Sequence, residues 1–180
     1  MNNRNQESAD LAAELPPPQY LTFALGREMF ATDIRSIKEI IEYAGLTTVP
    51  LMPAFIRGVI NLRGSVVPVI DLSVRFGREP TVLTRRTCVV IFEVCDDNGW
   101  QEIGVVVDSV SEVLEITASA IEPPPGFGAR LRPEFISGMA KLEGGFAIVL
   151  KVEGVLSVEE MAGLARFDCD AQAVAERNAA

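Results

Sequence analysis

The feature that most constrains the fold is an internal repeat, in which residues 53–72 and residues 133–152 share one pattern at an offset of 80 residues. The first copy is PAFIRGVINLRGSVVPVIDL and the second is PEFISGMAKLEGGFAIVLKV. Proline, large apolar residues and glycine coincide at Pro53/Pro133, Phe55/Phe135, Ile56/Ile136, Gly58/Gly138, Leu62/Leu142, Gly64/Gly144 and Val69/Val149. A repeat of this length is too long for a solenoid unit and favours a duplicated small barrel.

A second pair of segments extends the repeat. Residues 36–41 (SIKEII) match residues 109–114 (SVSEVL) at an offset of 73 residues. The two copies therefore cover about 34–72 and 107–152, with the same elements in the same order. The polar positions differ between them, as in Arg57/Ser137, Asn61/Lys141 and Arg63/Glu143. A shared core whose outer faces meet different partners would produce this difference.

Short β-strand patterns fill most of the chain. Apolar alternation and continuous apolar runs predict strands at 20–25, 29–32, 58–62, 65–72, 87–94, 103–107 and 146–152. Residues 34–41 fit either a helical turn or a strand. Pro68 cannot donate to a strand ladder, so its strand is predicted to be an edge or to carry a bulge. The whole pattern predicts a mainly β protein built from small barrels.

The two ends of the chain differ from its middle. Residues 1–18 are polar and end in three prolines, which predicts a mobile N-terminal tail. The Ala-rich, polar residues 168–180 predict a second mobile tail. Ser157 and Glu160 have the spacing of a capping box, so a short C-terminal helix is predicted from near Val158 to about Arg166.

Composition excludes several classes of function. The formal charge of −9 opposes nucleic-acid binding, which needs a basic face. No apolar run is long enough for a membrane span, and the N-terminus lacks a signal-peptide core, so we expect a cytoplasmic protein. The chain has no histidine, and its three cysteines lack metal-ligand spacing, so neither a metal nor a cofactor is predicted. Cys88 and Cys95 are predicted to be small core residues.

An enzyme is the competing class, and the sequence offers it little support. No nucleotide-binding loop of the form GxxxxGK[ST] is present, and no GxSxG motif surrounds a serine. The carboxylates are numerous but form no recognisable acid–base pair. A small-ligand sensor that uses the space between two lobes is a third possibility, which no sequence feature favours over a packed core.

The motifs together resemble the CheW family, the coupling proteins of bacterial chemotaxis, from about Tyr20 to Arg166. The residues that carry the resemblance are Phe23, Leu25 and Gly26; Ile37, Glu39 and Ile40; the run from Pro53 to Gly64; Pro68, Asp71 and Leu72; Gly104, Val107, Asp108 and Val110; and Gly138 with Leu142. Any one of these motifs alone is weak, whereas the set is specific.

The resemblance implies two SH3-like, five-stranded β-barrel lobes that interlock within residues 19–167 and enclose a hydrophobic core. It also implies a non-catalytic adaptor that joins the cytoplasmic tip of methyl-accepting chemoreceptors to the regulatory domain of the histidine kinase CheA. Such a protein would be recruited to receptor arrays at the inner membrane without inserting into it. The alternative is a CheW-like scaffold for a related gliding, twitching or developmental kinase pathway.

The resemblance also implies a receptor-facing surface around Arg63. Arginine before a turn glycine offers a planar set of donors to carboxylates or carbonyls. The alternative is an ion pair within the chain, with Glu39 as the candidate partner, and both interpretations can hold together. Glu39 itself is either a receptor contact or a solvated strand charge.

Six further residues are predicted to contribute to that surface: Ile37, Arg57, Gly58, Val59, Asn61 and Leu62. The three aliphatic residues are either half-exposed anchors for a receptor helix or plain core. Arg57 is predicted to add a rim contact, and Gly58 is predicted to shape the turn. Asn61 is predicted either to hold the turn through a side-chain hydrogen bond or to contact the receptor. No side chain is assigned to the kinase surface.

Overall fold

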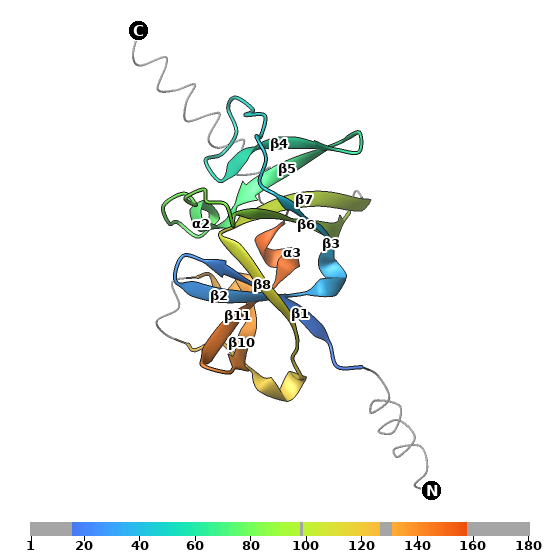
Figure 1. Ribbon diagram of the computed structural model, residues 1–180. Coiled ribbons are helices and arrows are strands. Elements are labelled where there is room, and N and C mark those ends of the chain that lie inside the picture. The colour runs from blue at the N-terminus through green and yellow to red at the C-terminus, as the bar shows by residue number, and fades with distance from the viewer. Residues whose placement is uncertain (1–15, 98, 127–130, 158–180) are drawn as a thin grey trace, which may run out of the picture.

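The computed structural model describes residues 16–97, 99–126 and 131–157, which form two β-sheets packed face to face (Figure 1). One sheet has the strand order β3-β6-β7-β5-β4 and forms what we call the upper lobe. The other has the order β8-β1-β2-β11-β10-β9 and forms the lower lobe. The short helix α3 lies between the two sheets, and α2 lies at the side of the upper one.

The first half of the described chain contains five strands and two short helical segments. Their bounds are β1 (Gln19–Leu25), β2 (Glu28–Asp33), the 3-10 turn η1 (Ile34–Ser36), β3 (Ile37–Glu42), β4 (Ile56–Leu62), β5 (Ser65–Asp71) and α2 (Leu72–Arg75). Residues 34–41, which fitted either a helical turn or a strand, therefore contain both. Pro68 lies in β5, an inner strand of its sheet, so the edge-strand alternative was wrong. The β4–β5 ladder does contain a bulge, but the extra residue lies on β4, between Ile56 and Gly58, and not on the strand of Pro68.

The second half repeats the five main strands and the final helix in the same order, but it adds η2, β9 and η3 and has no counterpart of η1. Its elements are β6 (Cys88–Asp96), β7 (Gly99–Val107), β8 (Ser109–Glu115), η2 (Ala118–Ala120), β9 (Ile121–Glu122), η3 (Pro133–Phe135), β10 (Ile136–Leu142), β11 (Gly145–Leu150) and α3 (Val152–Val155). The helix predicted at 158–166, the tail at 168–180 and nearly all of the tail at 1–18 lie outside the described residues.

The two halves exchange their first hairpins. β1 and β2 join β8, β10 and β11, whereas β6 and β7 join β3, β4 and β5. Each exchanged hairpin enters its new sheet through one parallel contact, β2 with β11 and β7 with β5. Neither lobe is therefore continuous in sequence, and neither can form without strands from the other half of the chain.

Three hydrophobic clusters fill this arrangement. Alternate residues of the strands point into the upper barrel, where Val67, Val69, Val89, Ile91 and Val106 pack together. A smaller cluster around Ala31, Ile116, Ala140, Ala147 and Val149 fills the lower barrel. The largest cluster lies between the sheets and contains Phe23, Phe30, Phe55, Phe92 and Phe135 among its members. Successive side chains of a strand thus point alternately into a barrel interior and into the core between the lobes.

The matching glycines Gly58 and Gly138 let each barrel close. A Cβ at Gly58 would lie 2.5 Å from the carbonyl oxygen of Thr47, which forms an isolated bridge with Val59. A Cβ at Gly138 would lie 2.5 Å from a methyl group of Ile121 in β9. Both glycines lie within strands, so Gly58 does not shape a turn, as the sequence had suggested; it makes room for a crossing segment.

The cysteine prediction was only partly right. Cys88 is half-buried, whereas Cys95 is exposed near the end of β6. Within the described residues, no helix is long and apolar enough to cross a membrane.

Candidate protein-interaction site

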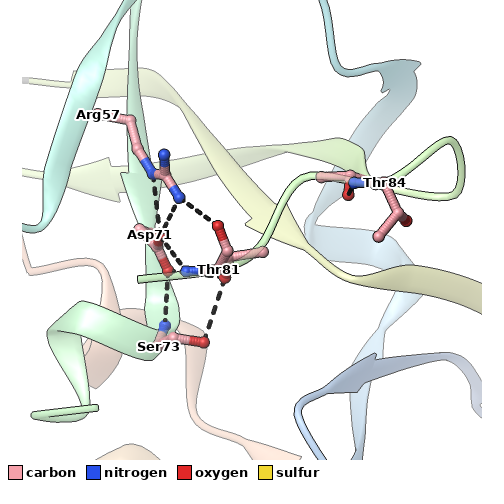
Figure 2. Close-up of polar contacts among 6 residues, drawn as sticks. Arg57, Asp71, Ser73, Thr81 and Thr84 are labelled. Carbon is pink, nitrogen blue, oxygen red and sulfur yellow. Dashed lines mark hydrogen bonds and ion pairs between the residues drawn. The ribbon is translucent and has the colours of Figure 1, made fainter. Parts of the chain in front are cut away.

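A buried carboxylate organises the polar contacts at the end of β5 (Figure 2). Asp71 has no exposed side-chain surface, and its Oδ2 accepts from Arg57 Nε at 3.0 Å and from Thr81 N at 2.9 Å. Its Oδ1 accepts from Ser73 N at 3.0 Å and from Thr81 Oγ1 at 2.9 Å. Both oxygens are thus saturated by donors, which is how a buried charge is tolerated.

The same cluster fixes the loop that follows α2. Asp71 is the N-cap of that helix, and it also binds Thr81, ten residues further along the chain. Arg57 donates from Nη2 to the carbonyl oxygen of Thr81 at 2.6 Å, so the loop is held from both sides. Arg57 therefore has a structural role, and its predicted rim contact with a receptor stays a prediction.

Arg63 and Glu39 form the ion pair that the sequence offered as one alternative. Arg63 Nη2 lies 2.9 Å from Glu39 Oε2, and the Arg63 side chain is still 70% exposed. Since β3 and β4 are the two edges of the upper sheet, this pair connects the edges across the barrel. Glu39 Oε1 is buried and has no hydrogen-bond partner. An exposed guanidinium remains available to another protein.

The hairpin turn that presents Arg63 is tightly specified. Arg63 has φ +52° and Gly64 has φ +88°, the left-handed pair that a two-residue turn with the twist of the strands requires. Asn61 Oδ1 accepts from Gly64 N at 2.9 Å, so Asn61 does hold the turn. In the lower hairpin Gly144 has φ +86°, while Glu143 is outside the positive-φ region. The two turns therefore differ in geometry as well as in charge.

The other predicted residues lie around this turn without forming one cluster. Val59 and Leu62 are half-buried on β4, with Leu62 packed against the upper barrel core. Ile37 is half-buried at the start of β3 and packs against the inter-lobe core instead. Gly58 is buried beneath Thr47. Lys38, on the outer side of β3, bonds to Glu102, and this bond raises the pKa of the lysine amine.

Sequence reasoning missed the Asp71–Thr81 contact. Asp71 was noted only as part of a motif, and Thr81 was not singled out at all. A signal for the capping role of Asp71 was available, because aspartate is a preferred N-cap residue where an apolar run ends. The bond to Thr81 had no such signal, since a loop contact over ten residues follows from the path of the chain.

Comparison with known proteins gives a consistent result. The model of the CheW-like domain matches residues 19–160. Chemotaxis protein CheW from Klebsiella aerogenes is 39% identical over 152 residues, covering 84% of this chain and 89% of that protein. Chemotaxis protein CheW from Treponema pallidum is 30% identical over 153 residues, covering 83% and 88%. Protein FrzA from Myxococcus xanthus is 30% identical over 135 residues, covering 74% and 81%.

A solved structure agrees with the fold. The scaffolding protein TtCheW from Thermoanaerobacter tengcongensis superposes with a TM-score of 0.71 at 34% identity, covering 79% of this chain and 90% of that one. The two-lobe β architecture and the matched length together exclude a chance likeness of isolated motifs. The chain belongs to the CheW family, the coupling and scaffolding proteins of bacterial chemotaxis.

Proposed function

We propose that this protein is a non-catalytic adaptor that joins the cytoplasmic tips of chemoreceptors to the regulatory domain of the histidine kinase CheA. It acts in the cytoplasm, on receptor arrays at the inner membrane. The observation that carries the proposal is the match to the CheW-like domain, which spans residues 19–160 and therefore both lobes.

The difference between the two hairpin surfaces supports binding of two unlike partners. The upper hairpin exposes Arg63 and Val66, and the lower hairpin exposes Glu143 and Phe146 at the matching positions. Val66 is 71% exposed and Phe146 is 54% exposed. A cationic turn beside a small apolar side chain and an anionic turn beside an aromatic ring favour different partners.

The upper hairpin is our candidate for the receptor surface. Arg63 is oriented by Glu39, which holds one Nη while the rest of the guanidinium faces solvent. A pre-oriented arginine loses less side-chain entropy on binding than a free one. Its remaining donors suit the carboxylates and carbonyls of a receptor helix. Val59 and Asn61, from the same strand, would complete the contact.

The first test is the substitution Arg63→Ala, with co-sedimentation on receptor-containing membranes and activation of CheA as readouts. We expect receptor binding to weaken about tenfold, equivalent to about 1.4 kcal/mol. Thermal stability should change little, because an exposed ion pair contributes only about 0–1 kcal/mol. Unchanged receptor binding and unchanged kinase activation would show that Arg63 is not part of the receptor-binding surface.

The matched control is Glu143→Ala, at the equivalent turn position of the lower hairpin. It removes a charge from the same kind of turn, so it reports any general effect of altering a hairpin tip. We expect receptor binding to be retained in this variant. If both variants lose receptor binding equally, the assignment of the receptor to the upper hairpin is wrong.

A second candidate is a scaffold for a related kinase pathway outside flagellar chemotaxis. The similarity to Protein FrzA, a relative without the chemotaxis name, favours keeping this candidate. Titration against the regulatory domains of the sensory kinases in the same organism distinguishes the two, since a specific adaptor should saturate one of them. A metabolite that raises the melting temperature without any kinase would instead identify a ligand sensor.

A further inference from the structure

The stretch between α2 and β6 is basic, although the chain as a whole is acidic. The chain has 16 cationic and 25 acidic residues, but residues 72–92 hold four arginines and one glutamate. Two of these arginines are engaged within the fold, because Arg75 lies over two phenylalanine rings and Arg78 pairs with Glu28. Arg85 and Arg86 are exposed, and neither forms an ion pair within the part of the chain that the structure describes.

These two arginines belong to a run of exposed residues, 82–86. Val82 is 79% exposed and Leu83 is 46% exposed, whereas Thr81 and Thr87, at the two ends of the run, are buried. The run therefore presents two apolar and two cationic side chains, and its ends are anchored in the upper lobe. Arginine beside exposed apolar side chains is typical of protein–protein contacts, in which arginine is enriched and lysine is depleted.

The first end of this loop is held by the contacts around Asp71 (Figure 2). Thr81 donates to Asp71 from both N and Oγ1, and its carbonyl oxygen accepts from Arg57. The Thr81 hydroxyl also lies 3.2 Å from Ser73 Oγ. Figure 2 shows the loop leaving this network and continuing to Thr84. The buried ion pair of the upper lobe therefore fixes the place where the exposed residues begin.

The second end of the loop is a turn closed by threonines. Thr87 N donates to Thr84 O at 3.2 Å, which places Arg85 and Arg86 at the two central positions of a β-turn. Thr84 N donates to the Thr87 hydroxyl at 2.8 Å, and Arg86 N donates to the Thr84 hydroxyl at 3.2 Å. Three backbone N–H groups are thus bonded inside the turn. A loop that is ordered before binding loses less entropy when a partner docks.

A cleft of about 430 Å³ borders the loop. Val82 and Arg86 line it from the loop, whereas Glu79 and Asp108 also contribute to its lining. The two carboxylates repel other carboxylates, so the acidic groups of a ligand are expected at the turn, near Arg85 and Arg86. The apolar groups of the same ligand are expected nearer Val82.

We propose that residues 82–86 form a docking surface for an acidic segment of another protein, whose carboxylates bind the two arginines and whose apolar side chains pack on Val82 and Leu83. Arginine binds carboxylates through parallel N–H···O bonds. Two unpaired arginines are few for nucleic-acid binding, and the formal charge of −9 opposes attachment to an anionic membrane. The loop is distinct from the hairpin that presents Arg63, so this proposal does not depend on receptor binding there.

The test measures the fluorescence anisotropy of a labelled synthetic peptide, rich in glutamate and with leucine at every third position, during titration with the full-length protein. We expect saturable binding that weakens as salt is added, because the contact contains exposed charge pairs. The double variant Arg85→Glu/Arg86→Glu should bind this peptide about tenfold more weakly or worse, since it places like charges opposite each other. Its far-UV circular dichroism should be unchanged, because both residues are exposed.

The matched control is Lys141→Glu/Lys151→Glu, which changes the net charge by the same amount at exposed positions of the lower lobe. Its affinity for the peptide should stay within about twofold of that of the unaltered chain. Glu79→Gln should have the opposite effect and strengthen binding slightly, because it removes a repelling charge beside the cleft.

The apolar part of the contact has its own variant, Val82→Ser/Leu83→Ser. We expect it to weaken peptide binding several-fold while the salt dependence stays the same, because the charges are retained. A second peptide, in which serine replaces every leucine, should bind the unaltered chain several-fold more weakly. Equal binding of the two peptides would contradict the apolar contact.

Three further outcomes would overturn the proposal. Equal losses in the arginine variant and in the lysine control would show that the peptide responds to net charge and not to this loop. Equally tight, arginine-dependent binding of phosphatidylglycerol vesicles or single-stranded DNA would identify a general anion site. If the arginine variant loses receptor co-sedimentation as Arg63→Ala does, while its peptide binding is unchanged, the loop belongs to the receptor surface instead.

Discussion

The unit β4–β5–α2 and the unit β10–β11–α3 have the same backbone plan but differ in their polar contacts. A buried phenylalanine, Phe55 or Phe135, directly precedes each unit, and each unit uses a strand glycine to admit a crossing segment. Each hairpin turn then needs a glycine with positive φ, Gly64 or Gly144. These shared residues define the barrel, and they coincide in the repeat because both lobes need the same volume and the same close approach.

The polar residues separate the two units. The first buries an Arg57–Asp71 ion pair, and the second has Ser137 and Lys151 at those places. The barrel forms in both cases, so the buried ion pair is not required for the fold. Its effect is local, because it fixes the chain after α2. The apolar pattern therefore specifies the fold of each lobe, while a few buried polar groups specify the path of the chain that follows the short helix.

Arg75 shows how the two units meet. Its guanidinium lies between the matching rings, 5.2 Å from the centroid of Phe55 and 5.0 Å from that of Phe135. Its Nε donates to the carbonyl oxygen of Val155 at 3.5 Å, and Val155 is the residue that matches Arg75 in the second unit. One arginine therefore contacts the matching rings of both units, at distances typical of a cation–π interaction.

The largest expected effect is the loss of stability in Asp71→Ala. Removing this carboxylate leaves the Arg57 guanidinium without its counter-charge and the Thr81 amide without its acceptor, so we expect a loss of about 3–5 kcal/mol in the free energy of unfolding. Urea denaturation measures it. The matched variant Lys151→Ala should stay within about 0.5 kcal/mol, because that residue is exposed. Similar losses of unfolding free energy in the two variants would contradict the claim that only the first unit depends on a buried carboxylate.

Substitutions of the two strand glycines test whether both units need the same close approach of a crossing segment. Both Gly58→Ala and Gly138→Ala force an atom into the crossing segment, which costs about 1–3 kcal/mol by overpacking. Gly58 also has φ +152°, a backbone conformation that residues with a Cβ rarely adopt, so part of the cost at this position is backbone strain. We therefore expect Gly58→Ala to lower the unfolding free energy more than Gly138→Ala does.

The control for this pair is Gly45→Ala, where no atom lies within 4 Å of the added Cβ. Its free energy of unfolding should change little, or rise slightly if the new residue restricts the unfolded chain. If Gly138→Ala proves the more damaging of the two strand variants, the positive φ of Gly58 adds too little to outweigh the tighter contacts at Gly138.

The smallest expected effect concerns the junctions before β3 and β8. Asp33 caps η1 and bonds to Arg35, and this hydrogen bond lowers the pKa of Asp33 from its ordinary value of 3.8. At the junction before β8, the matching aspartate position is different: Asp108 accepts a hydrogen bond from the backbone N–H of Gly26. Because the folded-state pKa of Asp33 is depressed, its stabilisation is present above the unfolded value and is lost as pH falls through the folded value.

Asp33→Asn should therefore lower the melting temperature slightly near neutral pH and lose this difference under acidic conditions. Melting curves of both proteins from pH 7 to pH 2 give the measurement, with about 1 kcal/mol as the upper size of an exposed pair. A difference that stays constant as pH falls below 3.8 would mean that the Asp33 charge is not its cause.

Much of the candidate site follows from the sequence alone. The turn at Arg63-Gly64 was predicted from its position between two apolar runs, and the pair with Glu39 was one of two stated alternatives. The bond from Gly64 N to Asn61 is local and follows from turn chemistry. What these residues bind remains a prediction, because it depends on proteins outside this chain.

Two related β lobes can be predicted from the amino-acid pattern, because the apolar positions and the glycines recur at a fixed offset. The exchange of β1–β2 and β6–β7 between the lobes is visible only in the folded protein, since strand periodicity indicates which face is buried but not which edge a strand pairs with. The structure likewise decided that Arg57 turns inward to Asp71 while Ser137 leaves a cleft, because these contacts depend on where the chain returns after each short helix.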